Sequence, residues 1–110
     1  MADTMGLEAF PTAKHLNPAG TVHGGYAATV LDMVTGIVVQ TALDVGESCA
    51  TVDLNVQIIK PLALGKAVKA EGHLIRRTRN LAFTRGSLID NNGDIYAHAQ
   101  STVMISAGRT

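Results

Sequence analysis

An apolar segment near the middle of the chain, residues 26–43, limits the possible folds more than any other feature. Asp32 and Gln40 interrupt it, and Thr, Gly and Ala are scattered through it. Such a segment is more typical of a buried helix than of a membrane span. Frequent Ala, Leu and Met and the lack of proline predict a helix over residues 24–43, with Gly46 as a stop signal beyond it. Because β-branched residues weaken its helical propensity, tertiary burial has to stabilise this helix.

Residues 50–58 alternate between apolar and polar side chains. The pattern predicts a half-buried strand that ends at Pro61, because proline cannot donate a ladder hydrogen bond. Apolar and polar residues would occupy opposite faces of it: Ala50, Val52, Leu54, Val56 and Ile58 on one, and Thr51, Asp53, Asn55 and Gln57 on the other.

Further strands are predicted at residues 66–77, 81–89 and 94–106, and a short stretch near residues 6–10 is a candidate first strand. The sequence Asp-Asn-Asn-Gly at residues 90–93 is a strong hairpin-turn signal. One helix with four or five antiparallel strands implies an α+β fold in which the sheet wraps around a central helix. Nothing else in a chain this short could cover so apolar a helix.

The composition indicates a single domain without a strongly charged partner. With 46% hydrophobic residues the chain can form one core, so residues 1–110 are expected to be one domain. Nine basic residues balance nine acidic ones, which predicts binding to neither nucleic acid nor a membrane surface. Cys49 is the only cysteine, and no signal-peptide pattern is present. Both observations predict a cytoplasmic protein.

The sequence contains no recognisable metal site or serine-hydrolase motif. Its histidines lack the spacing of a zinc site, and Cys49 has no companion thiol. The Gly-x-Ser-x-Gly pattern of a nucleophile elbow is absent. We therefore expect chemistry without a metal.

Gly24 and Gly25 stand at the start of the predicted helix. The N-terminus of a helix has unpaired backbone N–H groups and the positive end of the helix dipole, and glycines let a ligand approach them closely. Such a site suits a developing oxyanion on a carbonyl carbon. On the glycines alone, tight packing or a helix-entry turn is the better explanation.

Asp32 favours a functional interpretation of this region. On a helical wheel its neighbours are Ala28, Thr29, Thr35 and Gly36, a small and partly polar face that a ligand or another backbone could approach. A carboxylate satisfied by solvent or a nearby hydroxyl is the alternative. Upstream, Asn17 and His23 could instead serve as turn or loop residues. The full pattern Asn-x5-His-Gly-Gly-x6-Asp is far more specific than any of its members.

Four segments carry a resemblance to a known family: HLNPAGTVHGGYAATVLD, ATVDLNV, NLAFTRGSLID and NNGDIYAHAQSTVMI. They resemble the hotdog-fold acyl-CoA thioesterases of the phenylacetic-acid-degradation (PaaI-like) group, over residues 6–106. The resemblance implies a hotdog fold, in which the sheet wraps one long helix, and hydrolysis of acyl-CoA thioesters.

The resemblance also implies roles for the residues of the motif. Asn17 and the backbone N–H of Gly24 would polarise the thioester carbonyl, and His23 would support that loop near the sulfur. Asp32 would act either as general base on water or as nucleophile. Thr51 would orient the water, as a Ser or Thr on the following strand does in some relatives. Other relatives carry a hydroxyl four residues after the acid, where this chain has glycine.

Helix geometry predicts a homodimer. Gly24 and Asp32 are eight residues apart, or about 12 Å along one helix, whereas a base and an oxyanion donor must both lie close to one carbonyl. Two antiparallel helices would bring Asp32 of one protomer to Gly24 of the other. The resemblance adds that such dimers often pair again into tetramers.

Three basic residues, Arg76, Arg77 and Arg79, cluster between two strands beside Asn80, where the group could bind the phosphates of coenzyme A. Gly25 at the helix start is a further candidate for contact with the substrate. A solvated strand end is the alternative for the arginines. Coenzyme A would be part of the substrate, so no separate cofactor is expected.

A non-catalytic acyl-CoA-binding hotdog module is the alternative function, and a hotdog dehydratase is a weaker third. The sequence leaves the acyl group open.

Overall fold

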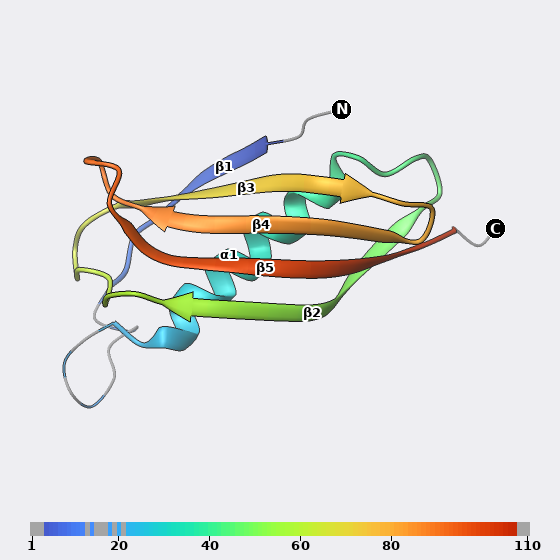
Figure 1. Cartoon of the computed structure of the whole chain (residues 1–110). Helices are drawn as coiled ribbons and strands as arrows, with labels where there is room; N and C mark the ends of the chain where they lie inside the picture. Colours follow the sequence, from blue (N-terminus) through green and yellow to red (C-terminus); the bar gives the residue numbers. More distant parts are fainter. Residues whose placement is uncertain (1–3, 13, 15–17, 19, 21, 108–110) are drawn as a thin grey trace.

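The computed structural model describes residues 4–12, 14, 18, 20 and 22–107 of the chain. Within these residues, one helix and five strands follow in the order β1 (Thr4–Ala9), α1 (Gly24–Gln40), β2 (Ser48–Ile58), β3 (Val68–Arg77), β4 (Leu81–Ile89) and β5 (Ile95–Ser106). The strands form a single antiparallel sheet in the order β1-β3-β4-β5-β2, and α1 crosses one face of it (Figure 1). The predicted α+β architecture is confirmed.

The helix ends earlier than the sequence pattern predicts. It stops at Gln40 rather than residue 43, and the N–H of Thr41 closes its last turn. Gly46 lies in a separate turn, in which the N–H of Glu47 donates to the carbonyl of Asp44 at 3.0 Å. Its φ of 84° suits glycine, so this residue turns the chain into β2 and does not cap the helix. Among the described residues, no helix is long and apolar enough to span a membrane.

Two glycines in the centre of the sheet let α1 pack directly on the strands. Gly72 of β3 and Gly86 of β4 are paired in register. A Cβ atom on Gly72 would lie 2.5 Å from the carbonyl oxygen of Val34, and one on Gly86 would lie 3.0 Å from Cγ2 of Thr35. Atoms of the helix, backbone at Gly72 and side chain at Gly86, therefore occupy the space that side chains would fill elsewhere in the sheet.

The sheet covers one side of α1 and leaves the other side open. The inner side carries fully buried residues such as Val34, Val38 and Thr35. On the outer side Asp32 and Gln40 are exposed, and Met33 is half exposed. The prediction that Thr35 shares the face of Asp32 is wrong. Its hydroxyl donates back to the carbonyl of Leu31 at 2.8 Å, beneath the helix.

A β-bulge in β2 overturns part of the predicted alternation. The register with β5 shifts between Thr51 and Asp53, which leaves Val52 as the extra, exposed residue. Before the bulge, Thr51 is paired with the buried Val103 and so faces the helix. Ala50 consequently lies on the outer face, whereas the predicted inward direction holds for Leu54, Val56 and Ile58, which pair with the inward-facing Ser101, Ala99 and Ala97.

Candidate active site

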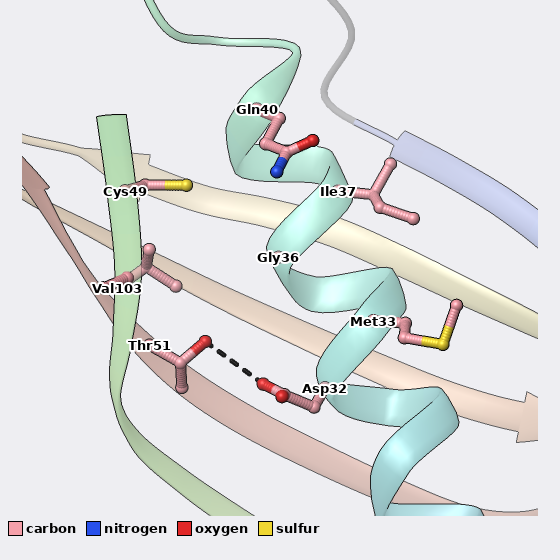
Figure 2. Close-up of a pocket in the computed structure, with 9 residues that line it drawn as sticks. Asp32, Met33, Gly36, Ile37, Gln40, Cys49, Thr51 and Val103 are labelled. Atoms are coloured by element: carbon pink, nitrogen blue, oxygen red, sulfur yellow. Dashed lines mark hydrogen bonds between the residues drawn. The ribbon is translucent and has the colours of Figure 1, made fainter. Parts of the chain in front are cut away.

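Asp32 and Thr51 meet across the gap between α1 and β2. The Thr51 Oγ1 hydroxyl donates a hydrogen bond to Oδ1 of Asp32 at 3.1 Å (Figure 2). Asp32 extends from the outer side of α1, and the bulge after Thr51 turns that hydroxyl toward it. The bond occupies one carboxylate oxygen, so Oδ2 is left for another donor such as a water molecule.

A groove begins at this pair and runs along α1. It has a volume of about 380 Å³, within the range of small-molecule sites, and is lined by Asp32, Met33, Gly36, Ile37, Gln40, Cys49, Ala50, Thr51 and Val103. Figure 2 shows Cys49 and Val103 on the β2 side, opposite Gly36. The lining is mostly apolar beyond the Asp32–Thr51 pair, so the groove suits an apolar group attached to a reactive polar centre.

The helix N-terminus is held by His23. Its Nδ1 accepts a hydrogen bond from the N–H of Gly25 at 2.8 Å, which makes His23 the N-cap. No described residue accepts a hydrogen bond from the N–H of Gly24, whereas that of Gly25 is already occupied. Both glycines also have packing reasons, because added Cβ atoms would lie 2.8 Å from Cδ1 of Ile58 and 2.9 Å from Nδ1 of His23.

Asn17, the second predicted oxyanion donor, lies outside the described residues. The described part of the site therefore consists of the capped helix start, the carboxylate with its threonine, and the groove.

The basic group at the end of β3 divides into two kinds of residue. Arg77 follows a second bulge, between Leu74 and Arg76, which turns it to the helix side of the sheet. Its Nη2 donates to both carboxylate oxygens of Glu47 at 2.8 Å, and its Nη1 donates to the carbonyl of Ala42. Arg77 thus ties β3 to the chain after α1, which occupies its guanidinium and argues against the predicted phosphate contact.

Arg76 and Arg79 are exposed, as is Asn80. The N–H of Ile105 donates to the backbone carbonyl of Asn80 at 2.7 Å, which leaves the Asn80 side chain at the surface of the β3–β4 turn. These three residues remain candidates for contact with an anionic group.

Apart from Asp32 and Thr51, the residues that line the groove were not among the site residues predicted from the sequence, and Cys49 and Val103 come from β2 and β5. Cys49 is half-buried, and burial raises the pKa of its thiol. Only the pairing of β2 with β5 brings both residues opposite the helix, and no local motif reports such a pairing. Among the described residues, no group of three or more His, Cys, Asp or Glu side chains could hold a metal ion.

The sequence is similar to a known family and to known proteins. The model of a family described as the thioesterase superfamily matches residues 19–97. Human acyl-coenzyme A thioesterase 13 is 29% identical over 90 residues, a match that covers 81% of this chain and 64% of the human protein. The chain thus spans less than two thirds of the length of that relative.

Solved structures share the fold over more than nine tenths of this chain. A phenylacetic acid degradation-related protein from Ralstonia eutropha JMP134 is 34% identical, with a TM-score of 0.86 and coverage of 94% of this chain and 76% of that one. A Bacillus halodurans protein solved with CoA is 25% identical, with a TM-score of 0.84 and coverage of 92% and 66%, respectively.

Proposed function

The chain belongs to the thioesterase superfamily, and we propose that it hydrolyses acyl-coenzyme A thioesters to a carboxylic acid and coenzyme A. The observation that carries the proposal is the hydrogen bond between Thr51 and Asp32 at the end of an apolar groove. The human relative is named an acyl-coenzyme A thioesterase, and the Bacillus protein was solved with CoA. Both names support the same substrate class.

In the proposed reaction, Asp32 accepts a proton from a water molecule held against its free oxygen. The water oxygen bonds to the thioester carbon, and the carbonyl oxygen becomes an oxyanion. The N–H of Gly24 and the amide of Asn17 stabilise this charge. The C–S bond then breaks, and the sulfur of coenzyme A leaves and receives the proton that Asp32 took up, which gives the free thiol. Because a thiolate leaves readily, no strong acid is required.

A nucleophilic route uses the same residues. The Asp32 carboxylate would attack the thioester carbon itself, expel the thiolate and form a mixed anhydride that water hydrolyses. Thr51 would then position the carboxylate rather than the water. Oxygen-18 from labelled water would enter Asp32 during a single turnover only by this route.

We propose that the working unit is a homodimer, with a dimer of dimers as a further step. Asp32 and Gly24 of one helix are about 12 Å apart along its axis, too far to act on one carbonyl. Asp32 lies on the open side of α1, where a second copy can reach it. Antiparallel pairing of two helices would place Asp32 beside Gly24 of the partner subunit and make two equivalent sites.

The anionic end of the substrate is assigned to the exposed basic group. Arg76 and Arg79, with Asn80, would contact phosphates of coenzyme A. Coenzyme A enters as part of the substrate, so the reaction needs no separate cofactor. Arg77 is left out because Glu47 occupies it.

The test of the base is Asp32→Asn, which keeps the size of the side chain and removes its charge. We expect turnover of the best acyl-CoA substrate to fall about a hundredfold or more, the scale of general-base loss. Release of coenzyme A can be followed with a thiol reagent. The matched control is Asp53→Asn, because Asp53 lies on β2 two residues after Thr51 but on the outer face of the sheet. This variant should keep wild-type turnover.

Wild-type turnover by the Asp32→Asn variant would refute the assignment. Tight binding of acyl-CoA without hydrolysis by the wild-type protein would instead support the alternative, a binding module.

Subunit complementation tests the shared site. Asp32→Asn chains and Asn17→Ala chains are mixed under conditions that exchange subunits. A mixed dimer would contain one doubly defective site and one intact site, so activity should recover to well above that of either parent. If mass spectrometry proves heterodimers and activity stays at the parental level, each site lies within one chain.

A further inference from the structure

Gly36 lies on the groove one helical turn after Asp32, and no packing contact requires a glycine there. A Cβ atom on Gly36 would meet no heavy atom within 4 Å. The residue lies well inside α1 and has no positive φ. Glycine in a helix interior destabilises the protein relative to alanine, because it gives up more conformational freedom on folding. The folded chain therefore tolerates an unfavourable residue that its own packing does not explain.

The open space beside Gly36 lies inside the groove. Gly36 stands four residues after Asp32, so a side chain there would extend from the same face of α1. Across the groove are Cys49 and Val103 (Figure 2). Any side chain at this position would narrow the groove just beyond the reactive pair.

We propose that the acyl chain of the substrate lies along α1 from Asp32 past Gly36 toward Gln40, and that Gly36 sets the bulk of acyl group accepted. The proposal rests on the thioesterase function proposed above and names its substrate class: acyl groups that extend beyond one helical turn. Four residues correspond to roughly 6 Å along the axis, so an acetyl group would not reach Gly36 whereas an octanoyl chain would.

The chemistry of the groove favours the acyl group over the other end of the substrate. Beyond Asp32 and Thr51 the lining is mostly apolar, and no Lys or Arg takes part in it. A phosphate-bearing arm would be poorly solvated there, whereas an aliphatic or aryl chain would lose water-exposed apolar surface.

A second copy of the helix would not fill this space in the proposed dimer. When Asp32 lies opposite Gly24 of the partner subunit, the partner's helix begins at that point. Gly36 then lies one turn beyond the start of the partner's helix, so the partner's helix itself does not cover the groove beside it.

The kinetic test compares Gly36→Ala and Gly36→Leu with the wild-type protein on acetyl-CoA and octanoyl-CoA. We expect Gly36→Ala to lower kcat/KM for octanoyl-CoA about tenfold more than for acetyl-CoA, because one added methyl group in an apolar slot discriminates on this scale. Gly36→Leu should increase the discrimination further. The melting temperature of Gly36→Ala should stay the same or rise, so the loss would not come from unfolding.

Gly6→Ala is the matched control. Gly6 lies on β1, at the opposite edge of the sheet from β2, and an added Cβ would make only ordinary contacts of 3.7 and 3.8 Å. This variant should leave the octanoyl-to-acetyl ratio unchanged. The proposal would be overturned if both Gly36 variants kept the wild-type octanoyl-to-acetyl ratio, whether or not they lost activity on both substrates.

Cys49 provides a readout that does not depend on hydrolysis. It is the only cysteine of the chain and lines the same groove, so its alkylation by iodoacetamide can be followed by mass spectrometry. S-octyl-CoA, a thioether that cannot be hydrolysed, should slow the alkylation, whereas S-methyl-CoA at equal occupancy should not. Equal rates with both thioethers would overturn the acyl position.

The two readouts separate this proposal from the proposed function. If the wild-type protein hydrolyses no acyl-CoA but the octyl thioether protects its Cys49, the proposed thioesterase function is refuted and the proposed acyl position beside Gly36 stands. If the protein hydrolyses acyl-CoA but the Gly36 variants do not change its preference between octanoyl-CoA and acetyl-CoA, the thioesterase function stands and the proposed role of Gly36 is refuted.

Discussion

The two sides of α1 use glycine in opposite ways. On the inner side, the helix lies against Gly72 and Gly86, where an added Cβ would come within 2.5 and 3.0 Å of helix atoms. On the outer side, Gly36 belongs to the helix itself and faces open space. The inner glycines are therefore needed for folding, because helix backbone at Gly72 and helix side chains at Gly86 fill the volume of their missing side chains. The outer glycine is not needed for folding, so its place in the groove calls for a functional reason.

The difference also separates stability from chemistry in this fold. The closely packed side carries Val34 and Val38, fully buried between helix and sheet. The open side carries Asp32, an exposed carboxylate whose observed partner is a threonine of the edge strand β2. Substitutions on the inner side should change the free energy of unfolding, and those on the outer side should change activity with little effect on folding.

Gly72→Ala is expected to have the largest effect. The added methyl group would collide with the backbone carbonyl of Val34, which cannot rotate away as a side chain can. Overpacking of this kind costs typically 1–3 kcal/mol, and a backbone contact belongs at about 3 kcal/mol or above. Urea denaturation followed by circular dichroism measures the change.

The same substitution on the open side is the control for that prediction. Gly36→Ala should be neutral or stabilise by up to ~1 kcal/mol, the difference in helix propensity. Comparable losses from Gly72→Ala and Gly36→Ala would remove the contrast between the two sides.

The regular part of the fold could be predicted from the sequence because its signals are local. Apolar composition over residues 26–43 marks the helix, and Asp90 with Gly93 marks the last hairpin. In the structure, the N–H of Gly93 donates to the carbonyl of Asp90 at 3.0 Å, and Gly93 has a φ of 84°. The close approach at Gly72 could not be predicted, since it depends on which strands lie under the middle of the helix.

The candidate site was only partly predictable, for the same reason. Asp32 and the glycines stand close together in the sequence, so their pattern is visible in one segment. Thr51 was expected on the polar outer face from the alternation, yet in the catalytic region from the resemblance. The bulge at Val52 resolves this conflict, and a bulge has no reliable local sequence signal. A second bulge turns Arg77 inward in the same way and removes it from the predicted phosphate contact.

Glu47→Gln tests the ion pair between Glu47 and Arg77, which links the chain after α1 to β3. We expect it to have an intermediate effect on stability. The N–H of Asp44 and the guanidinium of Arg77 hold the pKa of Glu47 below its ordinary value of 4.5. Because the folded state binds this proton less readily, the stabilisation is complete above pH 4.5 and is lost as the pH falls through the lowered pKa. The melting temperatures of wild type and variant should differ at neutral pH and converge in acid.

Glu8→Gln, at an exposed position on β1, is the control and should change the melting temperature little at either pH. A gap between wild type and Glu47→Gln that persists unchanged in acid would mean that the charge of Glu47 does not stabilise the fold.

The smallest expected effect concerns two hydroxyl groups on the helix side of the sheet. Thr84 of β4 and Ser101 of β5 are paired in register, and both are buried. Ser101 Oγ donates to the carbonyl of Asp53 at 3.1 Å. Among the described residues, the Thr84 hydroxyl has no hydrogen-bond partner. A buried hydroxyl without a partner carries a desolvation cost, whereas a bonded one contributes a small net gain.

Thr84→Val should therefore be neutral or stabilise the protein by up to ~1 kcal/mol, because a methyl group of similar size replaces an unpaired hydroxyl. Ser101→Ala should destabilise it by roughly 1 kcal/mol, since it removes a bonded hydroxyl and leaves the Asp53 carbonyl without that donor. Urea denaturation of both variants, with equal m-values as a check on two-state unfolding, measures the two changes. Losses of equal size would show that Thr84 is also bonded in solution, and the contrast between the two neighbouring hydroxyls would not hold.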